Sequence, residues 1–368
     1  MNKTTAAQMF MIMTLSRIFV TIMYIPPTNG KFYVSDLMVQ ILIGFVSLII
    51  TAFPIYLLMR SNNNSGFLDR CSNVSVFFGK LASLLLLLGI LFFSLRTLLR
   101  FELFVTTVIF PGADLRFFLV LMALSCLYAA VMGMSVIGRV TEIFFSLVIL
   151  SIVYVLASTA GRIEFTNFTP FLYGGIESPL KTGMLSMGVT IELMYPIMLK
   201  DKITGNSKAC IYPWIASNMA FLFIIMFWQA GVLGDYANTQ LFPFFSLTAL
   251  TTIGFLERLD AVLTAVWIVS VFVKISMFIH MGGMCLRTMF KPLSPKKSLY
   301  VMGAGLVIMS IFIKETVTMH AILSDITGIV ITFVVIAVVL PVILLSCEKC
   351  MDEKENGAEK FNEKSIQV

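Results

Sequence analysis

The sequence has few charged residues and few histidines, and both shortages exclude classes of protein. Only 12% of its 368 residues are Asp, Glu, Lys or Arg, whereas about a quarter of the residues of a soluble globular domain are charged. The two histidines, His280 and His320, form no HExxH pair, and the chain contains no Walker, GxGxxG or GxSxG motif. We therefore expect a protein that is not an enzyme and that holds no metal or cofactor.

Hydrophobic residues, by contrast, make up 58% of the chain and gather in long runs. A helix needs about 20 apolar residues to cross the hydrocarbon core of a bilayer. The runs that approach this length are 8–26, 37–59, 77–106, 116–136, 140–160, 180–199, 209–232, 258–286, 299–314 and 322–346. The sequence predicts an all-α polytopic membrane protein with about ten transmembrane helices over residues 1–346, followed by a polar cytoplasmic tail over residues 347–368.

The basic residues predict how the chain crosses the membrane. Loops on one side contain most of the Lys and Arg residues, for example Arg60, Arg139 and Lys202, whereas the opposite loops contain few, such as Lys31 and Arg162. The positive-inside rule then places both termini in the cytoplasm. The first run has no small-residue cleavage site, so we expect it to be an uncleaved helix.

The cysteines do not suggest a disulfide framework. On this topology Cys126 lies within a span, and the cytoplasmic side holds Cys71, Cys210, Cys285, Cys347 and Cys350. All six are therefore expected to be reduced. Cys347 and Cys350 form a single CxxC motif, which is weak evidence for metal or redox chemistry when no second pair accompanies it.

The stretch MLSMGVTIELMYP, residues 184–196, places a glycine, a carboxylate and a proline inside a hydrophobic run. Gly188 permits local unwinding, and Pro196 removes a backbone hydrogen bond. Backbone freed from helical bonding at this depth is tolerated only where it is buried or lines a cavity. A kinked packing helix, with an ion pair at the glutamate, is the alternative to a functional site. The candidate ligand site in this segment comprises Met187, Gly188, Thr190 and Glu192.

Ionisable residues occur inside other runs as well, and each is a functional candidate because burial of a charge in a bilayer is costly. Ser16 and Arg17 lie in the middle of the first run and join the candidate ligand site. Alternatively, Arg17 pairs with a buried carboxylate and only holds helices together. Arg100 and Glu102 are expected at the outer interface. The residues expected to support the site or to form ion pairs are Arg96, Glu257, Arg258, Asp260 and Lys274.

The interruptions fall at matching places if ten spans divide as five plus five. The first span contains Ser16 and Arg17, and the sixth contains Gly188 and Glu192. Secondary transporters built from inverted repeats bind their substrate at the bilayer midplane between two such broken helices. Arg17 would complement an anionic group and Glu192 a cationic one, so a zwitterionic amino acid is a plausible ligand. The two side chains could equally neutralise each other.

One set of motifs resembles a known family. Phe242-Pro243, the stretch IGFLERLD over residues 253–260 and Trp267 are similar to the FP…ERLD…W signature of the spore germination permeases. The similarity extends over most of residues 8–346. It implies the LeuT-type fold of the amino acid–polyamine–organocation superfamily. It also implies the B subunit of a germinant receptor in the inner membrane of bacterial spores, which binds a nutrient such as an amino acid and works with A and C subunits.

The sequence leaves both the ligand and the function open. The first span contains no glycine between Met1 and Gly30, where relatives often have small residues, so the ligand need not be a simple apolar amino acid. The same midplane pocket would serve a proton- or sodium-coupled amino acid or amine transporter. An ion channel subunit, with Arg17, Arg96, Lys274 and Glu192 lining a pore, is a third possibility.

Overall fold

Helices form at the hydrophobic runs that the sequence predicts. The computed structural model describes residues 3–22, 36–61, 63–110, 116–169, 172, 175–186, 190–206, 210–251, 260–313 and 325–351. The first half contains α1 (Ala6–Ile22), α2 (Asp36–Arg60), α3 (Phe67–Val74), α4 (Val76–Phe104) with the π-helical turn η1 (Val105–Ile109), α5 (Arg116–Met132) and α6 (Met134–Thr159). The second half contains α7 (Glu177–Ser186), α8 (Met194–Met198), α9 (Ile211–Leu233), α10 (Pro243–Ala249), α11 (Asp260–Met289), α12 (Pro295–Ile313) and α14 (Ile326–Val334), which continues through the π-helical turn η9 (Val335–Val339) to Met351. Short 3-10 turns are η2 (Ala160–Arg162), η3 (Phe165–Phe168), η5 (Ile191–Leu193), η6 (Lys200–Lys202) and η8 (Gly234–Thr239).

Several of these helices are long and apolar enough to cross a membrane. Within the described ranges there are six: Asp36–Arg60, Val76–Ile109, Met134–Arg162, Ile211–Thr239, Trp267–Met289 and Thr327–Met351. Ala6–Ile22 and Phe117–Met132 are shorter apolar helices. Exposed apolar side chains recur every three or four residues on α2, at Leu42, Val46, Ile50 and Phe53, as expected of a helix face turned to hydrocarbon. The predicted all-α polytopic membrane protein is confirmed, whereas the five-plus-five repeat stays a prediction.

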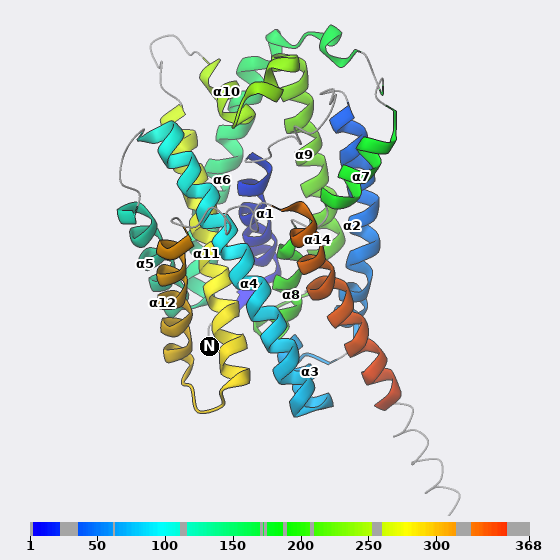
Figure 1. Ribbon diagram of the computed structural model, residues 1–368, viewed down its shortest axis with the longest axis vertical. Helices are drawn as coiled ribbons and strands as arrows, with labels where there is room; N and C mark the ends of the chain where they lie inside the picture. Colours follow the sequence, from blue (N-terminus) through cyan, green and yellow to red (C-terminus); the bar gives the residue numbers. More distant parts are fainter. Residues whose placement is uncertain are drawn as a thin grey trace, which may run out of the picture.

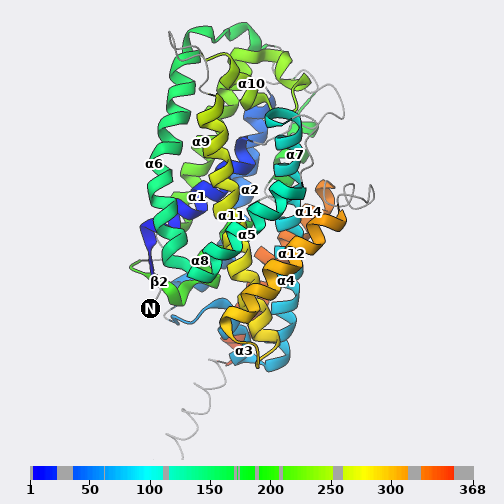
Figure 2. The same cartoon turned by 90° about the vertical axis from the view of Figure 1, so that its left-hand side faces the viewer.

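Helix α1 runs through the interior of the bundle, where Figures 1 and 2 show it surrounded by longer helices. It contacts α6, α9 and α11, and α11 in turn contacts α4, α5 and α12. Met9, Ile12 and Met13 on α1 have no exposed surface. Helix α10 lies at one end of the bundle and α3 at the other (Figure 1). A helix this short and this enclosed is held by its neighbours, and its polar residues Ser16, Arg17 and Thr21 are buried in protein.

The beginning of α1 is joined to the segment that follows α8. Strand β1 (Thr4–Thr5) pairs in parallel with β2 (Ile203–Thr204), so that Thr4 lies opposite Ile203 and Thr5 opposite Thr204. The Cys210 thiol also donates a hydrogen bond to the Ala6 carbonyl at 3.3 Å. These contacts couple the start of α1 to the end of the α8 segment, although some 200 residues separate them in the chain.

Arg70 in α3 connects three segments at the α3 end of the bundle. Its guanidinium is bidentate to Glu348, with Nε and Nη2 lying 2.7 and 2.5 Å from the carboxylate oxygens. Its Nη1 donates to the Leu58 carbonyl at 2.8 Å, and Lys200 Nζ donates to the carbonyls of Leu58 and Ser61 at 3.2 and 2.9 Å. Arg70 and Lys200 therefore interact favourably with the partial negative charge of the carbonyl groups at the C-terminal end of α2.

All six cysteines are free in the described structure, and Cys71, Cys126, Cys210 and Cys285 are buried. Burial raises the pKa of the Cys71 thiol to about 12, so this side chain in α3 stays protonated and unreactive at neutral pH. Cys347 is half-buried and Cys350 is exposed. The four buried cysteines are therefore packing residues, and Cys347 and Cys350 lie at or near the surface.

Helices α2 and α7 approach so closely that glycine is required at their contact. A Cβ atom added to Gly183 would lie 2.7 Å from the Gln40 carbonyl oxygen and 2.9 Å from Ile43 Cβ. On the other helix, a Cβ added to Gly44 would lie 2.6 Å from Ser186 Oγ. Small residues at such crossings let the backbones of membrane helices pack tightly.

We predict that Gly183→Ala lowers the free energy of unfolding by about 1 to 3 kcal/mol, because the backbones of α2 and α7 must separate. Gly305→Ala in α12 is the matched control, since a Cβ there meets nothing within 4 Å. It should change stability by less than about 0.5 kcal/mol. Unfolding of the purified proteins in nanodiscs measures both values, and equal effects of the two substitutions would contradict the packing account.

We also predict that Arg70→Gln destabilises the protein by about 3 kcal/mol, because Glu348 and the Leu58 carbonyl lose a buried donor. Arg60→Gln, which changes an exposed arginine at the end of α2, is the control and should have little effect. The same unfolding measurement compares them. A loss that is no larger for Arg70→Gln than for Arg60→Gln would refute the connecting role of Arg70.

Candidate functional site

The sixth predicted span is divided into two helical pieces. Helix α7 ends at Ser186, and η5 and α8 carry the chain from Ile191 to Met198. Thr190, which precedes η5, has φ −108° and ψ 45° and is not helical. Met187 and Gly188 lie outside the described residues, so their assignment to the site stays a prediction. The non-helical backbone at Thr190 is fully buried, as required for such backbone inside a membrane protein.

Glu192, in the short turn after the interruption, forms an ion pair with Lys274 in α11. The Lys274 Nζ atom lies 2.5 Å from Glu192 Oε1, and the two side chains are 3% and 0% exposed. Removing two charges from water costs several kcal/mol per ion, which only close pairing and further polar contacts offset. The pair therefore fixes the position of η5 against the middle of α11.

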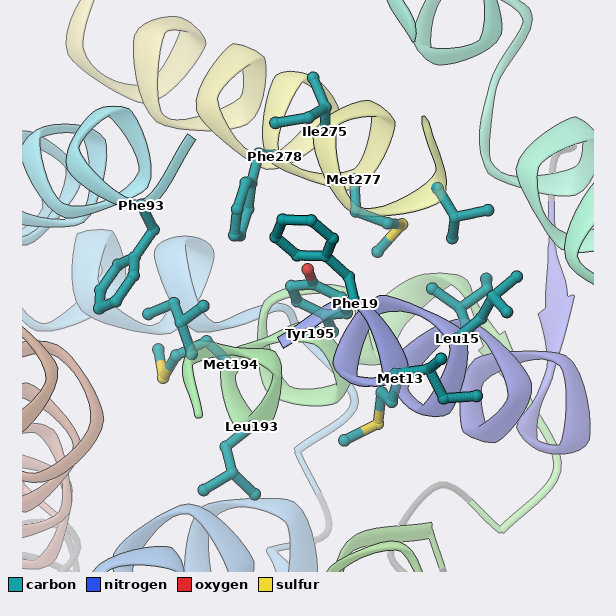
Figure 3. Packing of buried hydrophobic residues seen from close by; sticks show 14 of the residues in the cluster. Met13, Leu15, Phe19, Phe93, Leu193, Met194, Tyr195, Ile275, Met277 and Phe278 are labelled. Carbon is teal, nitrogen blue, oxygen red and sulfur yellow. The ribbon is translucent and has the colours of Figure 1, made fainter. Parts of the chain in front are cut away.

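Aromatic rings and a second cation surround this pair. Lys274 Nζ lies 6.0 Å from the ring centroid of Phe19 and 5.7 Å from that of Phe278, within the range of cation–π attraction. Figure 3 shows these two rings beside Tyr195, with α1, α8 and α11 each contributing one residue. Arg17 in α1 is 4% exposed and lies within electrostatic range of Glu192. The Glu192 carboxylate thus has two cations near it. Lys274 contacts it directly, and Arg17 lies close by.

Several polar atoms around the interruption have unused hydrogen-bonding capacity. Ser16, Thr190, Glu192 and Tyr195 have no exposed surface. Among the contacts within the described chain, Thr190 Oγ1 and Glu192 Oε2 make no hydrogen bond, and the hydroxyls of Ser16 and Tyr195 interact only with each other. Buried polar atoms are nearly always satisfied, so Thr190 and Glu192 retain hydrogen-bonding capacity that a polar group between α1 and α8 can use.

A small cavity lies next to Lys274. It has a volume of about 20 Å³, room for roughly one water-sized group. Its walls come from α1, α4 and α11, and the residues are Phe19, Val20, Phe93, Arg96, Thr97, Arg100 and Lys274. The structure thus places Arg96 and Lys274, which the sequence assigned to one supporting set, at a shared cavity.

An aromatic cluster adjoins this cavity through Phe19. The Trp267 ring centroid lies 4.1 Å from that of Phe104, 5.3 Å from that of Phe19 and 5.6 Å from that of Phe101. Phe104 also contacts Phe242 in an edge-to-face arrangement at 5.3 Å. Trp267 and Phe242, which carry the family resemblance, therefore both pack against Phe104.

Other predicted residues are not brought to this site by the described structure. Glu257 and Arg258 lie outside the described residues, and Asp260 is the first residue of α11. The expected ion-pair cluster at residues 257–260 therefore stays a prediction. Glu102, expected at the outer interface, is instead buried, with 8% of its surface exposed.

Sequence reasoning missed Tyr195, Phe19 and Phe278 as site residues. Tyr195 follows Glu192 by three residues and so lies on the same helix face, a spacing that could have identified it. The two phenylalanines carried no such signal, because the chain contains 33 of them. The Glu192–Lys274 partnership was also missed, since no spacing rule connects residues that lie 82 positions apart.

We predict that Glu192→Gln and Lys274→Met each lower the free energy of unfolding by about 3 to 5 kcal/mol, because each leaves one buried charge unpaired. The double variant should lose less than the sum of the single losses, by at least about 1 kcal/mol, because both charges are then absent. Unfolding of the wild type, the two single variants and the double variant in nanodiscs gives the four free energies that this double-mutant cycle compares. Additive losses would show that the pair is not energetically coupled.

Comparison with known proteins agrees with the resemblance read from the sequence. The family model described as "Spore germination protein", the spore permeases, matches residues 3–319. Spore germination protein KB of Bacillus subtilis (strain 168) is 26% identical over 203 residues, which cover 53% of this chain and 54% of the relative. The aligned region thus spans about half of that curated relative. Because the family model matches most of the chain, this protein belongs to the spore germination protein family.

Proposed function

We propose that this protein is the B-type, membrane-embedded subunit of a germinant receptor, in which a small nutrient binds between α1 and the α7–α8 interruption. The observation that carries the proposal is the Glu192–Lys274 ion pair beside the unused polar atoms Thr190 Oγ1 and Glu192 Oε2 and the buried hydroxyls of Ser16 and Tyr195. Membership in the spore germination protein family supports a role in germination. A polar ligand would satisfy these buried groups without leaving a charge unpaired.

The charges favour a zwitterionic nutrient such as an amino acid. Its ammonium group would approach Glu192, which offers Oε2 as an acceptor, and its carboxylate would take the place of Glu192 beside a cation. A zwitterion has no net charge, so its entry leaves the charge balance of the buried site unchanged. A ligand carrying only one charge would upset that balance in a medium of low dielectric constant.

Ligand entry would be transmitted through the ion pair. A nutrient that separates Glu192 from Lys274 releases η5 from α11, and α11 contacts α4, α5 and α12. Because β1 pairs with β2, movement of the α8 segment would also be passed to the start of α1. The protein would thereby report occupancy to A and C subunits of the receptor, the partners implied by the family resemblance.

The proposal includes a membrane arrangement. The chain would form a five-plus-five inverted repeat of the LeuT type in the spore inner membrane, with both termini in the cytoplasm. Helix α1 and the α7–α8 segment would be the equivalent first helices of the two halves. Their contact with each other, and the polar residues inside both, support this pairing.

Ligand-dependent thermal stabilisation tests the function. Purified protein in nanodiscs should be stabilised by one or more members of a panel of amino acids, sugars and amines, since a ligand that binds only the folded state adds stability. At a ligand concentration 100 times its Kd the gain should be about 2.7 kcal/mol. If no compound on the panel shifts the unfolding temperature, the proposed function is wrong.

Matched variants locate the site within the same assay. Glu192→Gln and Ser16→Ala should abolish or strongly reduce the ligand-induced shift. Glu177→Gln and Ser125→Ala change exposed residues on α7 and α5 and should retain it. Unchanged shifts in both site variants would place the ligand elsewhere, and ligand-driven uptake into vesicles would favour a transporter over a receptor.

A further inference from the structure

The cavity beside Lys274 is unusually rich in positive charge for a site inside a membrane helix bundle. Arg96 and Arg100 lie one helical turn apart on α4 and line the cavity that Lys274 lines from α11. None of the described residues that line it is acidic. The remaining walls include Phe19 and Phe93, whose rings exclude water and so strengthen electrostatic interactions in the space between them.

Among the described residues, the charges next to Arg96 and Lys274 are mostly positive. Lys274 has its carboxylate partner, Glu192, but Arg17 and Arg96 both lie within electrostatic range of Lys274 and repel it. Arg96 and Arg100 likewise repel each other. The Nε atom of Arg96 is buried and makes no hydrogen bond within the described ranges. An unused guanidinium donor thus lies at a cavity whose walls are positive.

We propose that this cavity binds a single small anionic group, the carboxylate of the nutrient or a free monovalent anion, with Arg96 as its principal partner and Lys274 as the second. This inference deepens the proposed function and rests on it where the anion belongs to the nutrient. A guanidinium offers paired donors that match a carboxylate, and an ammonium adds a compact point charge. The cavity volume of about 20 Å³ suits one such group and not a whole amino acid.

Lys274 then links the two parts of the site. While the cavity is empty of anion, Glu192 neutralises Lys274. When an anion occupies the cavity, Lys274 has a second negative partner, and Glu192 becomes available to an ammonium group. A nutrient without a carboxylate would separate the ion pair and leave Lys274 and Arg96 facing each other without compensation. The site therefore discriminates against amines that lack a carboxylate.

The test titrates anions against the full-length protein in nanodiscs at constant ionic strength. Sodium chloride or sodium acetate replaces the sodium salt of 2-(N-morpholino)ethanesulfonate, an anion too large for the cavity, while the unfolding temperature is recorded. Chloride and acetate should raise the unfolding temperature saturably. Arg96→Gln should weaken the apparent anion affinity at least about tenfold, and Arg96→Lys should restore part of it.

Arg162→Gln, which removes an exposed arginine in η2, is the matched control and should leave the anion titration unchanged. Equal stabilisation by all three anions in the wild type would overturn the proposal. So would a titration of Arg96→Gln that coincides with the wild type. Because Arg96→Lys keeps the charge, its partial rescue separates anion binding from a general packing role of Arg96.

Competition identifies the source of the anionic group. A nutrient carboxylate that occupies the cavity should shift the chloride titration to higher concentration, whereas the corresponding decarboxylated amine should not. Additive effects of nutrient and chloride would assign the cavity to a free anion. Loss of anion dependence with an intact nutrient response would refute only this inference, and the reverse result would refute only the proposed function.

Discussion

The ion pair between Glu192 and Lys274 is the constraint around which the rest of the structure is arranged. Both charges are buried, so neither could be kept there without the other. The pair holds η5, which carries Glu192, in the interior of the bundle. It also holds α11, which carries Lys274, against η5. The aromatic rings of Phe19 and Phe278 then shield the pair from lipid and water.

Contacts at the periphery hold the segments that carry this ion pair in place. Pairing of β1 with β2 ties α1 to the α8 segment, and glycine contacts hold α7 against α2. At the α3 end of the bundle, Arg70 joins α2 and α3 to Glu348 beyond η9. Each segment that supports the central ion pair is therefore attached to another part of the bundle.

Composition and run length were sufficient to predict the class of fold, because burial in lipid requires long apolar segments. That the helix is interrupted between α7 and η5 was predictable, because one hydrophobic run contains both a carboxylate and a proline. The partner of Glu192 was not predictable, since Arg17 and Lys274 were equally suitable by charge and only packing decides between them. Phe19 and Phe278 were missed for a similar reason. Their role depends on which helices contact one another, and a sequence with apolar residues on every helix face does not specify those contacts.

The most direct test of the central claim is a structure of the protein with its stabilising nutrient bound. The account predicts that the nutrient contacts Ser16, Thr190 and Glu192 within about 4 Å, with Lys274 displaced from Glu192. Nutrient bound at a surface away from the α7–α8 interruption, with the Glu192–Lys274 pair intact, would contradict it.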